Sequence, residues 1–236
     1  MGSQHAKREH YLKRLMSTHL RSSELRRYVE LPARLDGRSI LDIGAGTSTT
    51  SMDFADSGVR FIALDLRFRS VDEVKTSSGD YFKSYKSNLD DPVLRRHNPM
   101  LATVYEHDKA DSTRFFSDFV GRSRGTYVAG DLWRLPFADN SFDFVLSIRC
   151  LSDCYVDADV FLEAALEALR VVKRGSCVQI SPWQTDYLSL GRGLPIGASA
   201  RQQEQIIQLL QSHGIDCRLK KVRSSDVQCL QLSFLK

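Results

Sequence analysis

Residues 39–48 read Ser-Ile-Leu-Asp-Ile-Gly-Ala-Gly-Thr-Ser, an apolar run that ends in a glycine-rich turn. A short apolar run of this kind is typical of a strand that is buried on both faces of a sheet. Gly44 and Gly46 allow a sharp turn and a close approach of a ligand to the main chain. A helix is predicted from Ser48 to Ser57, and its first N–H groups would face an anionic ligand. This order of elements indicates an α/β fold with a ligand site at the turn.

Strands and helices alternate along the rest of the chain. Further strands are expected over 59–66, 126–131, 142–147, 177–180, 217–222 and 227–235, with helices over 157–174 and 201–213. Gly175 is expected to cap the first of these helices. The alternation predicts a Rossmann-like, seven-stranded, mostly parallel sheet with helices on both faces. Ligands of such sheets bind beyond the carboxyl ends of the strands.

Two segments interrupt this pattern. Residues 1–38 are expected to form an N-terminal helical extension of a domain that spans 39–236. The extension is basic, which fits either a solvated helix face or a surface for an anionic partner. Residues 67–125 are too long for a simple crossover and too aromatic for a disordered linker. We predict that they form a helical, lid-like insertion, with a packing or dimer surface as the alternative.

The composition argues against several classes of protein. The 236 residues are 42% hydrophobic, with a net charge of +4 and a mean hydropathy of −0.29. No apolar run reaches the roughly 18 residues of a membrane span, and the first residues lack the apolar core of a secretory signal. The five cysteines form no Cys-x-x-Cys pair, which argues against a disulfide framework and a zinc site. We expect a cytoplasmic protein without a metal.

An acidic residue, Asp65, ends the second predicted strand. A carboxylate at this place accepts the two hydrogen bonds of a ribose diol. In dinucleotide-binding turns, a third small residue stands at the position of Thr49 and allows close packing of helix and strand. Because Thr49 is β-branched and bulky, the turn departs from the pattern for NAD.

Four motifs in this order resemble the class I S-adenosylmethionine-dependent methyltransferase family. Residues 42–48 are similar to its first motif, although Ser48 replaces a usual third glycine. Residues 65–66 match its ribose acid and an adenine-packing neighbour, and residues 131–132 match the pair that reads the adenine edge. The sequence Leu-Pro-Phe-Ala-Asp-Asn-Ser-Phe-Asp at 135–143 is similar to the branch that includes many quinone, sterol and natural-product methyltransferases.

The resemblance implies S-adenosylmethionine as cofactor. The cofactor-binding residues that it implies are Asp42, Gly44, Gly46, Thr47, Asp65, Leu66, Asp131, Leu132 and Ser147. It also implies that the loop after residue 147 faces the transferred methyl group. In that loop, Arg149 is a candidate to bind an acidic group of the acceptor, and Asp153 or Tyr155 to orient or deprotonate it. For each of the three, a solvated loop residue or helix cap is the alternative.

The first hypothesis is therefore a methyltransferase that acts on a small-molecule metabolite or natural product by direct displacement. An RNA-directed methyltransferase that uses the basic N-terminal helix is an alternative. A second alternative is a non-catalytic, methyltransferase-like regulatory subunit, and a nicotinamide dehydrogenase is the least favoured. The sequence leaves the acceptor atom and the oligomeric state open.

Overall fold

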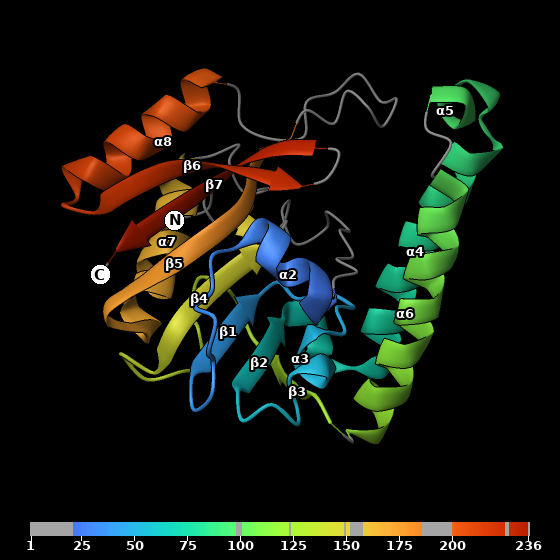
Figure 1. The fold of residues 1–236 in the computed structure, drawn as a ribbon, viewed down its shortest axis with the longest axis horizontal. Coiled ribbons are helices and arrows are strands. Elements are labelled where there is room, and N and C mark those ends of the chain that lie inside the picture. Colours follow the sequence, from blue (N-terminus) through green and yellow to red (C-terminus); the bar gives the residue numbers. More distant parts are fainter. Residues whose placement is uncertain are drawn as a thin grey trace, which may run out of the picture.

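The glycine-rich turn follows an inner strand of a sheet whose central strands run parallel. The computed structural model describes residues 21–97, 101–122, 124–148, 150–151, 158–185, 200–224 and 227–235. Within these residues, seven strands form a sheet in the order β3-β2-β1-β4-β5-β7-β6 (Figure 1). The strands are β1 (Ser39–Ile43), β2 (Arg60–Asp65), β3 (Thr126–Ala129), β4 (Phe142–Ile148), β5 (Val172–Thr185), β6 (Asp216–Ser224) and β7 (Val227–Leu235).

Strands β1 to β5 run parallel, whereas β7 is antiparallel to both β5 and β6. The predicted Rossmann-like α/β architecture is therefore confirmed. Chain order reverses beside β1, because β1 has β2 on one side and β4 on the other. In an open α/β sheet, the crevice at such a reversal is where ligands bind. The fold thus directs attention to the ends of β1, β2 and β4.

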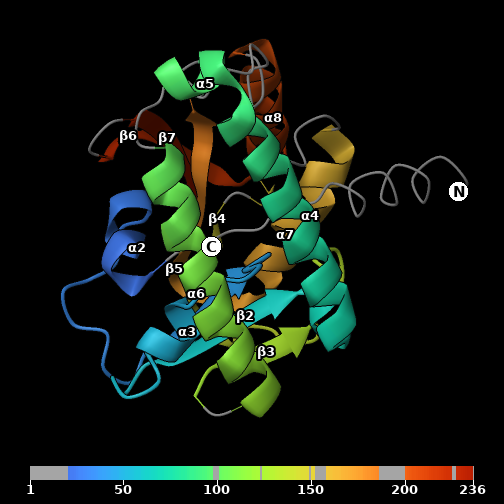
Figure 2. The same cartoon turned by 90° about the vertical axis from the view of Figure 1, so that its right-hand side faces the viewer.

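Different helices cover the two faces of the sheet (Figures 1 and 2). The flanking helices are α2 (Ser22–Tyr28), α3 (Thr50–Asp53), α7 (Ala158–Val171) and α8 (Ala200–Ser212). Side chains of a strand alternate between the two faces. Ile40 of β1 accordingly joins the core beneath α2, and its neighbour Leu41 joins the core beneath α7 and α8. Among the described residues, no helix has the length and apolar character needed to span a membrane.

The segment 21–38 is fastened to this core. Leu25 of α2 and Val29, the residue after its end, are buried against the sheet. The buried amide of Gln179 on β5 donates to the carbonyl oxygen of Glu30 and accepts from its backbone N–H, both at 2.7 Å. The rest of the predicted extension, residues 1–20, lies outside the described residues.

The helix after the glycine turn is shorter than predicted. The predicted range was 48–57, and α3 contains one turn, Thr50–Asp53. The hydroxyl of Ser48 accepts from the backbone N–H of Thr50 at 3.2 Å and bonds to the Thr50 hydroxyl at 2.6 Å. Hydroxyl side chains that bond the local backbone compete with helical hydrogen bonds, which accounts for the short helix.

The predicted end of the helix over 157–174 was also wrong. Helix α7 ends at Val171, and β5 begins at the next residue, where Val172 pairs with Phe142 of β4. Gly175 has a φ of 75°, but it lies inside β5 and does not cap the helix. Lys173 donates to the carboxylate of Asp143 at 3.0 Å and so supports the early strand start.

Residues 66–121 form a helical hairpin on the β2–β3 side of the sheet. The hairpin consists of the 3₁₀ helix η1 (Leu66–Arg69) and of α4 (Val71–Asp90), α5 (Pro92–His97) and α6 (Leu101–Gly121). Helices α4 and α6 lie side by side and extend beyond the sheet (Figures 1 and 2). Aromatic side chains at the base of the hairpin, Phe68, Phe115 and Phe119, pack with Tyr127 of β3 at ring-centroid distances of 5.3–6.0 Å. The base is therefore part of the core.

Candidate cofactor site

The glycine turn lies against the end of β2. Gly44 and Gly46 have φ values of 73° and 57°, a region that favours glycine. The backbone N–H groups of Gly44 and Ala45 both donate to the carbonyl oxygen of Leu64, at 2.7 and 3.0 Å. Cys150 packs so closely on Gly44 that a Cβ atom there would overlap its side chain. The turn is thus fixed from both sides, and Gly44 has two separate reasons to be glycine.

The carboxylate of Asp65 points at this turn, as the sequence predicts for the ribose acid. It is 5% exposed and receives four hydrogen bonds. The backbone N–H of Gly46 (3.1 Å) and Arg67 Nη2 (2.6 Å) reach Oδ2, while the backbone N–H (3.0 Å) and Nε (2.7 Å) of Arg67 reach Oδ1. An ionised carboxylate offers about four acceptor positions. Arg67 and Gly46 therefore use the whole acceptor capacity of Asp65.

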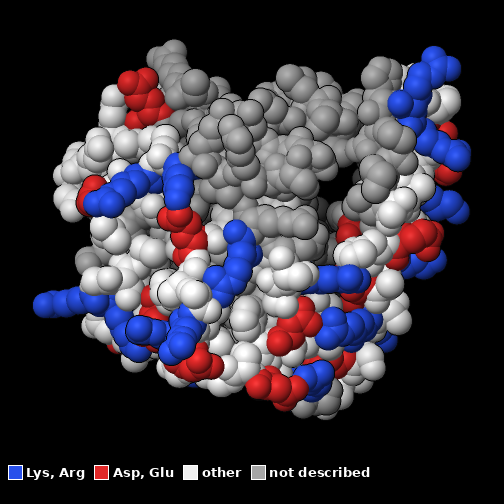
Figure 3. Space-filling view, in the orientation of Figure 1, with Lys and Arg blue, Asp and Glu red and all other residues white. Residues whose placement is uncertain are grey.

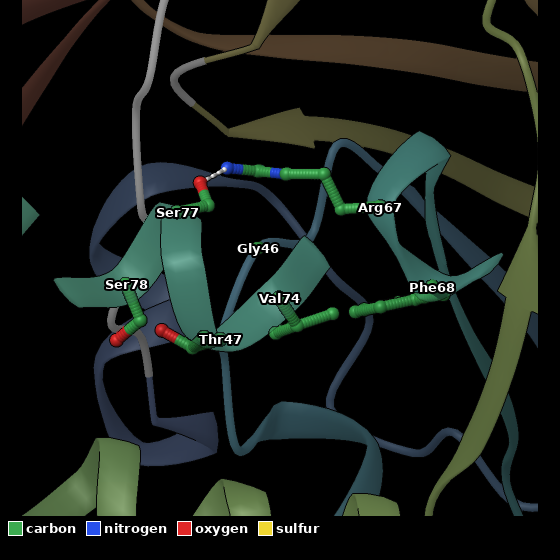
Figure 4. A pocket seen from close by; sticks show the side chains of 7 residues that line it. All are labelled: Gly46, Thr47, Arg67, Phe68, Val74, Ser77 and Ser78. Carbon is green, nitrogen blue, oxygen red and sulfur yellow. Dashed lines mark hydrogen bonds between the residues drawn. The ribbon is translucent and has the colours of Figure 1, made fainter. Parts of the chain in front are cut away.

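Sequence reasoning missed the part that Arg67 plays. Asp65 is predicted from its place at the end of a strand, whereas the sequence marks Arg67 only as the first residue of the predicted insertion. Its guanidinium also donates to the hydroxyl of Ser77 on α4 at 2.5 Å, as the dashed line in Figure 4 marks. Burial lowers the pKa of Arg67, but the hydrogen bonds and charge of Asp65 outweigh burial and raise it above its ordinary value.

A small cavity lies between the glycine turn, η1 and α4. Its volume of about 10 Å³ holds at most about one water molecule. Arg67 crosses one side of it, and Val74 and Phe68 lie on another (Figure 4). The complete lining is Gly46, Thr47, Arg67, Phe68, Val74, Ser77 and Ser78. The predicted residues Gly46 and Thr47 thus face α4 across the cavity.

A second carboxyl group, Asp42, lies at the same turn. It is 3% exposed, and its Oδ1 atom has no hydrogen-bond partner. Burial, with the charge of Asp65 as a smaller cause, raises the pKa of Asp42 to about 8. The carboxyl is accordingly protonated at neutral pH. An unpaired buried polar atom at a turn that suits a ligand fits the predicted cofactor role.

Three further predicted residues follow neighbouring strand ends. Leu66 is half-buried directly after Asp65, and Asp131 and Leu132 are half-buried after β3, whose Ala129 pairs with Asp65. The Asp131 carboxylate accepts from the backbone N–H of Trp133 at 3.0 Å. The structure therefore brings the predicted ribose and adenine residues to adjacent strand ends, as the sequence requires.

The segment that carries Asp131 is held by α7. Arg170 donates to the carbonyl oxygens of Leu135 (3.0 Å) and Phe137 (2.8 Å), while Glu167 accepts from the backbone N–H of Leu135 at 3.0 Å. Arg170 and Glu167 are themselves paired at 2.9 Å. This pairing lowers the pKa of Glu167, so the glutamate stays ionised. We name these two side chains the Arg170–Glu167 clip.

Ser147 at the end of β4 is fully buried, and its hydroxyl accepts from the backbone N–H of Leu151 at 2.9 Å. This hydrogen bond fixes the path of the chain directly after β4. The predicted acceptor residues Arg149, Asp153 and Tyr155 lie outside the described residues. Within the described ranges, no group of three or more His, Cys, Asp or Glu side chains is placed to hold a metal ion.

Comparison with known proteins matches this chain to methyltransferases. A family model described as a methyltransferase domain matches residues 93–180, from α5 into β5. The demethylmenaquinone methyltransferase of Beutenbergia cavernae is 28% identical over 152 residues, which cover 63% of this chain and 42% of that protein. The enzyme of the same name from Renibacterium salmoninarum is 27% identical over 176 residues, which cover 71% of this chain and 54% of that protein.

The chain is thus similar to methyltransferases, the class that its motifs resemble. It spans about half the length of the curated methyltransferases that it matches. A solved methyltransferase from Methanosarcina mazei aligns with a TM-score of 0.47 and 15% identity, over 92% of this chain and 97% of that one. The matched region 93–180 excludes the glycine turn and Asp65. The resemblance of the glycine turn and Asp65 to methyltransferase motifs is therefore independent of the family match.

Proposed function

We propose that this protein transfers the methyl group of S-adenosylmethionine to a small-molecule acceptor. The observation that carries the proposal is the juxtaposition of the glycine turn with Asp65, joined by the hydrogen bond from the Gly46 N–H at 3.1 Å. Asp131 follows the adjacent strand end, where the base of a bound nucleoside would lie. The residues present thus fit the cofactor in type and in order along the sheet edge.

The bound cofactor supplies an activated methyl group and its own leaving group, so the protein contributes mainly orientation. Gly44 and Gly46 let the ligand approach the backbone, and Asp65 is the acceptor for a ribose diol. Asp42, protonated at neutral pH, has a buried oxygen that a polar group of the ligand can satisfy. The Arg170–Glu167 clip fixes the segment after β3 that carries Asp131.

For the acceptor, we propose a quinone-like or natural-product metabolite. The names of the two demethylmenaquinone methyltransferases support this class. The helical hairpin rises beside the carboxyl ends of the strands, which supports its proposed use as a lid in a domain that spans 39–236 (Figure 1). Arg149, Asp153 and Tyr155 stay the proposed acceptor residues, because they follow β4.

The face shown in Figure 3 gives no support to the RNA-directed alternative. On the face shown in Figure 3, basic and acidic side chains of the described residues are interspersed over the hairpin and the lower part of the molecule. An RNA surface is expected to gather basic side chains on one face or along one groove. That alternative rested on the basic segment 1–38, of which residues 1–20 lie outside the described residues.

Calorimetric titration with S-adenosylmethionine and S-adenosylhomocysteine tests the proposal, with NADH as a negative control. We expect both sulfur compounds to bind and NADH not to bind. Asp65→Ala removes the ribose acceptor and is expected to weaken binding at least tenfold. Asp72→Ala is the matched control, because Asp72 is an exposed acid in the first turn of α4.

Methyl transfer is then measured with demethylated quinones as acceptors and radiolabelled methyl donor. Binding without transfer to any acceptor would favour the non-catalytic regulatory alternative. Absence of binding by the folded wild-type protein would refute the proposed function.

A further inference from the structure

The side chain of Arg67 occupies the acceptor positions that a ribose needs. Two of the four hydrogen bonds to Asp65 come from the guanidinium, one to each carboxylate oxygen. A ribose diol also donates to a carboxylate through two hydroxyl groups. Because Gly46 and the backbone N–H of Arg67 use the remaining positions, the diol and the guanidinium cannot bind Asp65 at the same time.

Loss of charge does not remove Arg67 from this place. The guanidinium is held in its charged form by Asp65, with a pKa above the ordinary value. The arginine therefore leaves Asp65 only by rotation of its side chain. That side chain is 25% exposed, whereas the side chain of Asp65 is 6% exposed, so the arginine has a route to solvent and the acid does not.

The same guanidinium ties the site to the helical hairpin. Nη1 donates to Ser77 in the first half of α4, and Ser77 lines the cavity together with Gly46 and Thr47 of the glycine turn (Figure 4). Arg67 thus bridges Asp65 at the end of β2 and Ser77 of α4. Rotation of its side chain breaks both contacts together.

We propose that Arg67 is an internal competitor of the cofactor that also latches α4 onto the end of β2. Binding of the ribose displaces the guanidinium from Asp65 and, with it, from Ser77, so the hairpin loosens at its base when the cofactor binds. This inference rests on the proposed function, since it assumes that Asp65 takes the ribose. It assigns Arg67 a regulatory part, in which the latched form lowers the apparent affinity for the cofactor.

Arg67→Gln tests the competition. The amide is shorter and uncharged, and it cannot reproduce the two-pronged contact with a carboxylate. Titration with S-adenosylhomocysteine is expected to give a dissociation constant about tenfold lower than that of the wild type, as when a competing state is removed. Arg69→Gln is the matched control, because Arg69 lies on the same 3₁₀ helix, is exposed and pairs with Glu73 at the surface at 3.3 Å. Its dissociation constant should equal that of the wild type.

Hydrogen exchange of the backbone tests the latch in the unmutated protein. Addition of S-adenosylhomocysteine should speed exchange of amides around Ser77 on α4. Ser77→Ala, which breaks the latch and leaves the pair with Asp65 intact, should show the faster exchange without ligand. These two measurements test the latch even where Arg67→Gln fails to fold.

Unchanged or weaker binding by folded Arg67→Gln would overturn the competition, and slower α4 exchange on ligand addition would overturn the latch. Both results leave the proposed function intact, provided that the wild type binds. If neither the wild type nor Arg67→Gln binds S-adenosylhomocysteine, the proposed function fails and this inference fails with it.

Discussion

The carboxylate of Asp143 binds Ser39 twice, with its Oδ2 atom 2.9 Å from the backbone nitrogen and 2.6 Å from the hydroxyl oxygen of Ser39. Ser39 opens β1 and Asp143 lies near the start of β4, so this contact joins the two strands at the end opposite the candidate site. Arg38 and Lys173 add charged donors at 3.2 and 3.0 Å. Four hydrogen bonds thus converge on one buried carboxylate.

Asp143→Asn should destabilise the protein at neutral pH. The amide lacks the charge and presents N–H groups where the carboxylate accepts, so the donors around it lose their partner. We expect the free energy of unfolding to fall by about 2–4 kcal/mol, the range for a buried charged hydrogen-bond network. Urea denaturation at pH 7 measures the change, with exposed Asp90→Asn as a control that should stay within about 0.5 kcal/mol.

The same variant should change the response to acid. Burial alone would raise the pKa of Asp143, but the hydrogen bonds from Ser39, Lys173 and Arg38 hold it well below the ordinary value of 3.8. A lowered pKa contributes stability that is present above pH 3.8 and is lost as the pH falls through the folded-state value. The stability gap between wild type and Asp143→Asn should therefore narrow on acidification below about pH 4. A gap that stays constant from pH 7 to pH 2.5 would contradict this assignment.

The ionisation of Asp42 should change the stability of the protein with pH in the opposite direction to that of Asp143. Burial and the charge of Asp65 raise its pKa from 3.8 to about 8, so the unfolded chain releases this proton at a lower pH than the folded protein does. Its contribution is complete below pH 3.8 and is lost as the pH rises to about 8. Asp42→Asn, which mimics the protonated form, should equal the wild type in stability near pH 4 and exceed it at pH 8.

Denaturant titrations at pH 4, 6 and 8 measure this difference between Asp42→Asn and wild type. A variant that is less stable than wild type at pH 8 would show that Asp42 is ionised in the fold. Cofactor titration of the same variant reports whether the unpaired Oδ1 atom takes part in binding.

The sequence was sufficient for the sheet and for the acid at the end of β2, because both follow from short-range patterns. The apolar run 39–43 is a strand with the predicted bounds, and Asp65 faces the glycine turn through the Gly46 N–H. The sequence did not predict that Arg67 folds back on Asp65. A separation of two residues does not define the direction of a side chain, which depends here on Ser77, ten residues further along the chain.

Two predicted helix boundaries were wrong. The Ser-Thr run after the glycine turn was treated as helix from its length, yet the Ser48 hydroxyl bonds the backbone and leaves one helical turn. Val172 was assigned to a helix by its neighbours, but its pairing with Phe142 in the sheet outweighs local preference. The second boundary depends on pairing with a distant strand, which a window of neighbouring residues does not contain, whereas the first depends on the direction of a hydroxyl group two residues away.

The Arg170–Glu167 clip should matter for stability more than its surface position suggests. Arg170→Gln removes donors to two backbone carbonyl oxygens, those of Leu135 and Phe137, and leaves Glu167 without its main partner. We expect a loss of about 1.5–3 kcal/mol in the free energy of unfolding. Arg134→Gln is the control on the same segment, because Arg134 is exposed. Equal effects of the two variants would show that the clip contributes no more than a surface charge.

Gly44 and Gly175 offer a direct comparison between backbone strain and close packing. Their φ values, 73° and 75°, are nearly the same, so replacement by alanine strains both backbones alike. A Cβ atom on Gly175 would meet no atom within 4 Å, whereas one on Gly44 would overlap Cys150. Gly175→Ala should therefore cost about 1–2 kcal/mol, the usual penalty for a left-handed alanine.

Gly44→Ala should cost clearly more, about 3 kcal/mol or above, because the overlap with Cys150 adds to the strain. It should also weaken cofactor binding at least tenfold, since the turn that faces Asp65 has to shift. Urea denaturation and S-adenosylhomocysteine titration of both variants measure these effects. Cys150→Gly in the Gly44→Ala background should recover the part of the loss that comes from overlap and leave the part that comes from strain. Equal stabilities of Gly44→Ala and Gly175→Ala would mean that Cys150 moves away freely and that the turn is held from the β2 side alone.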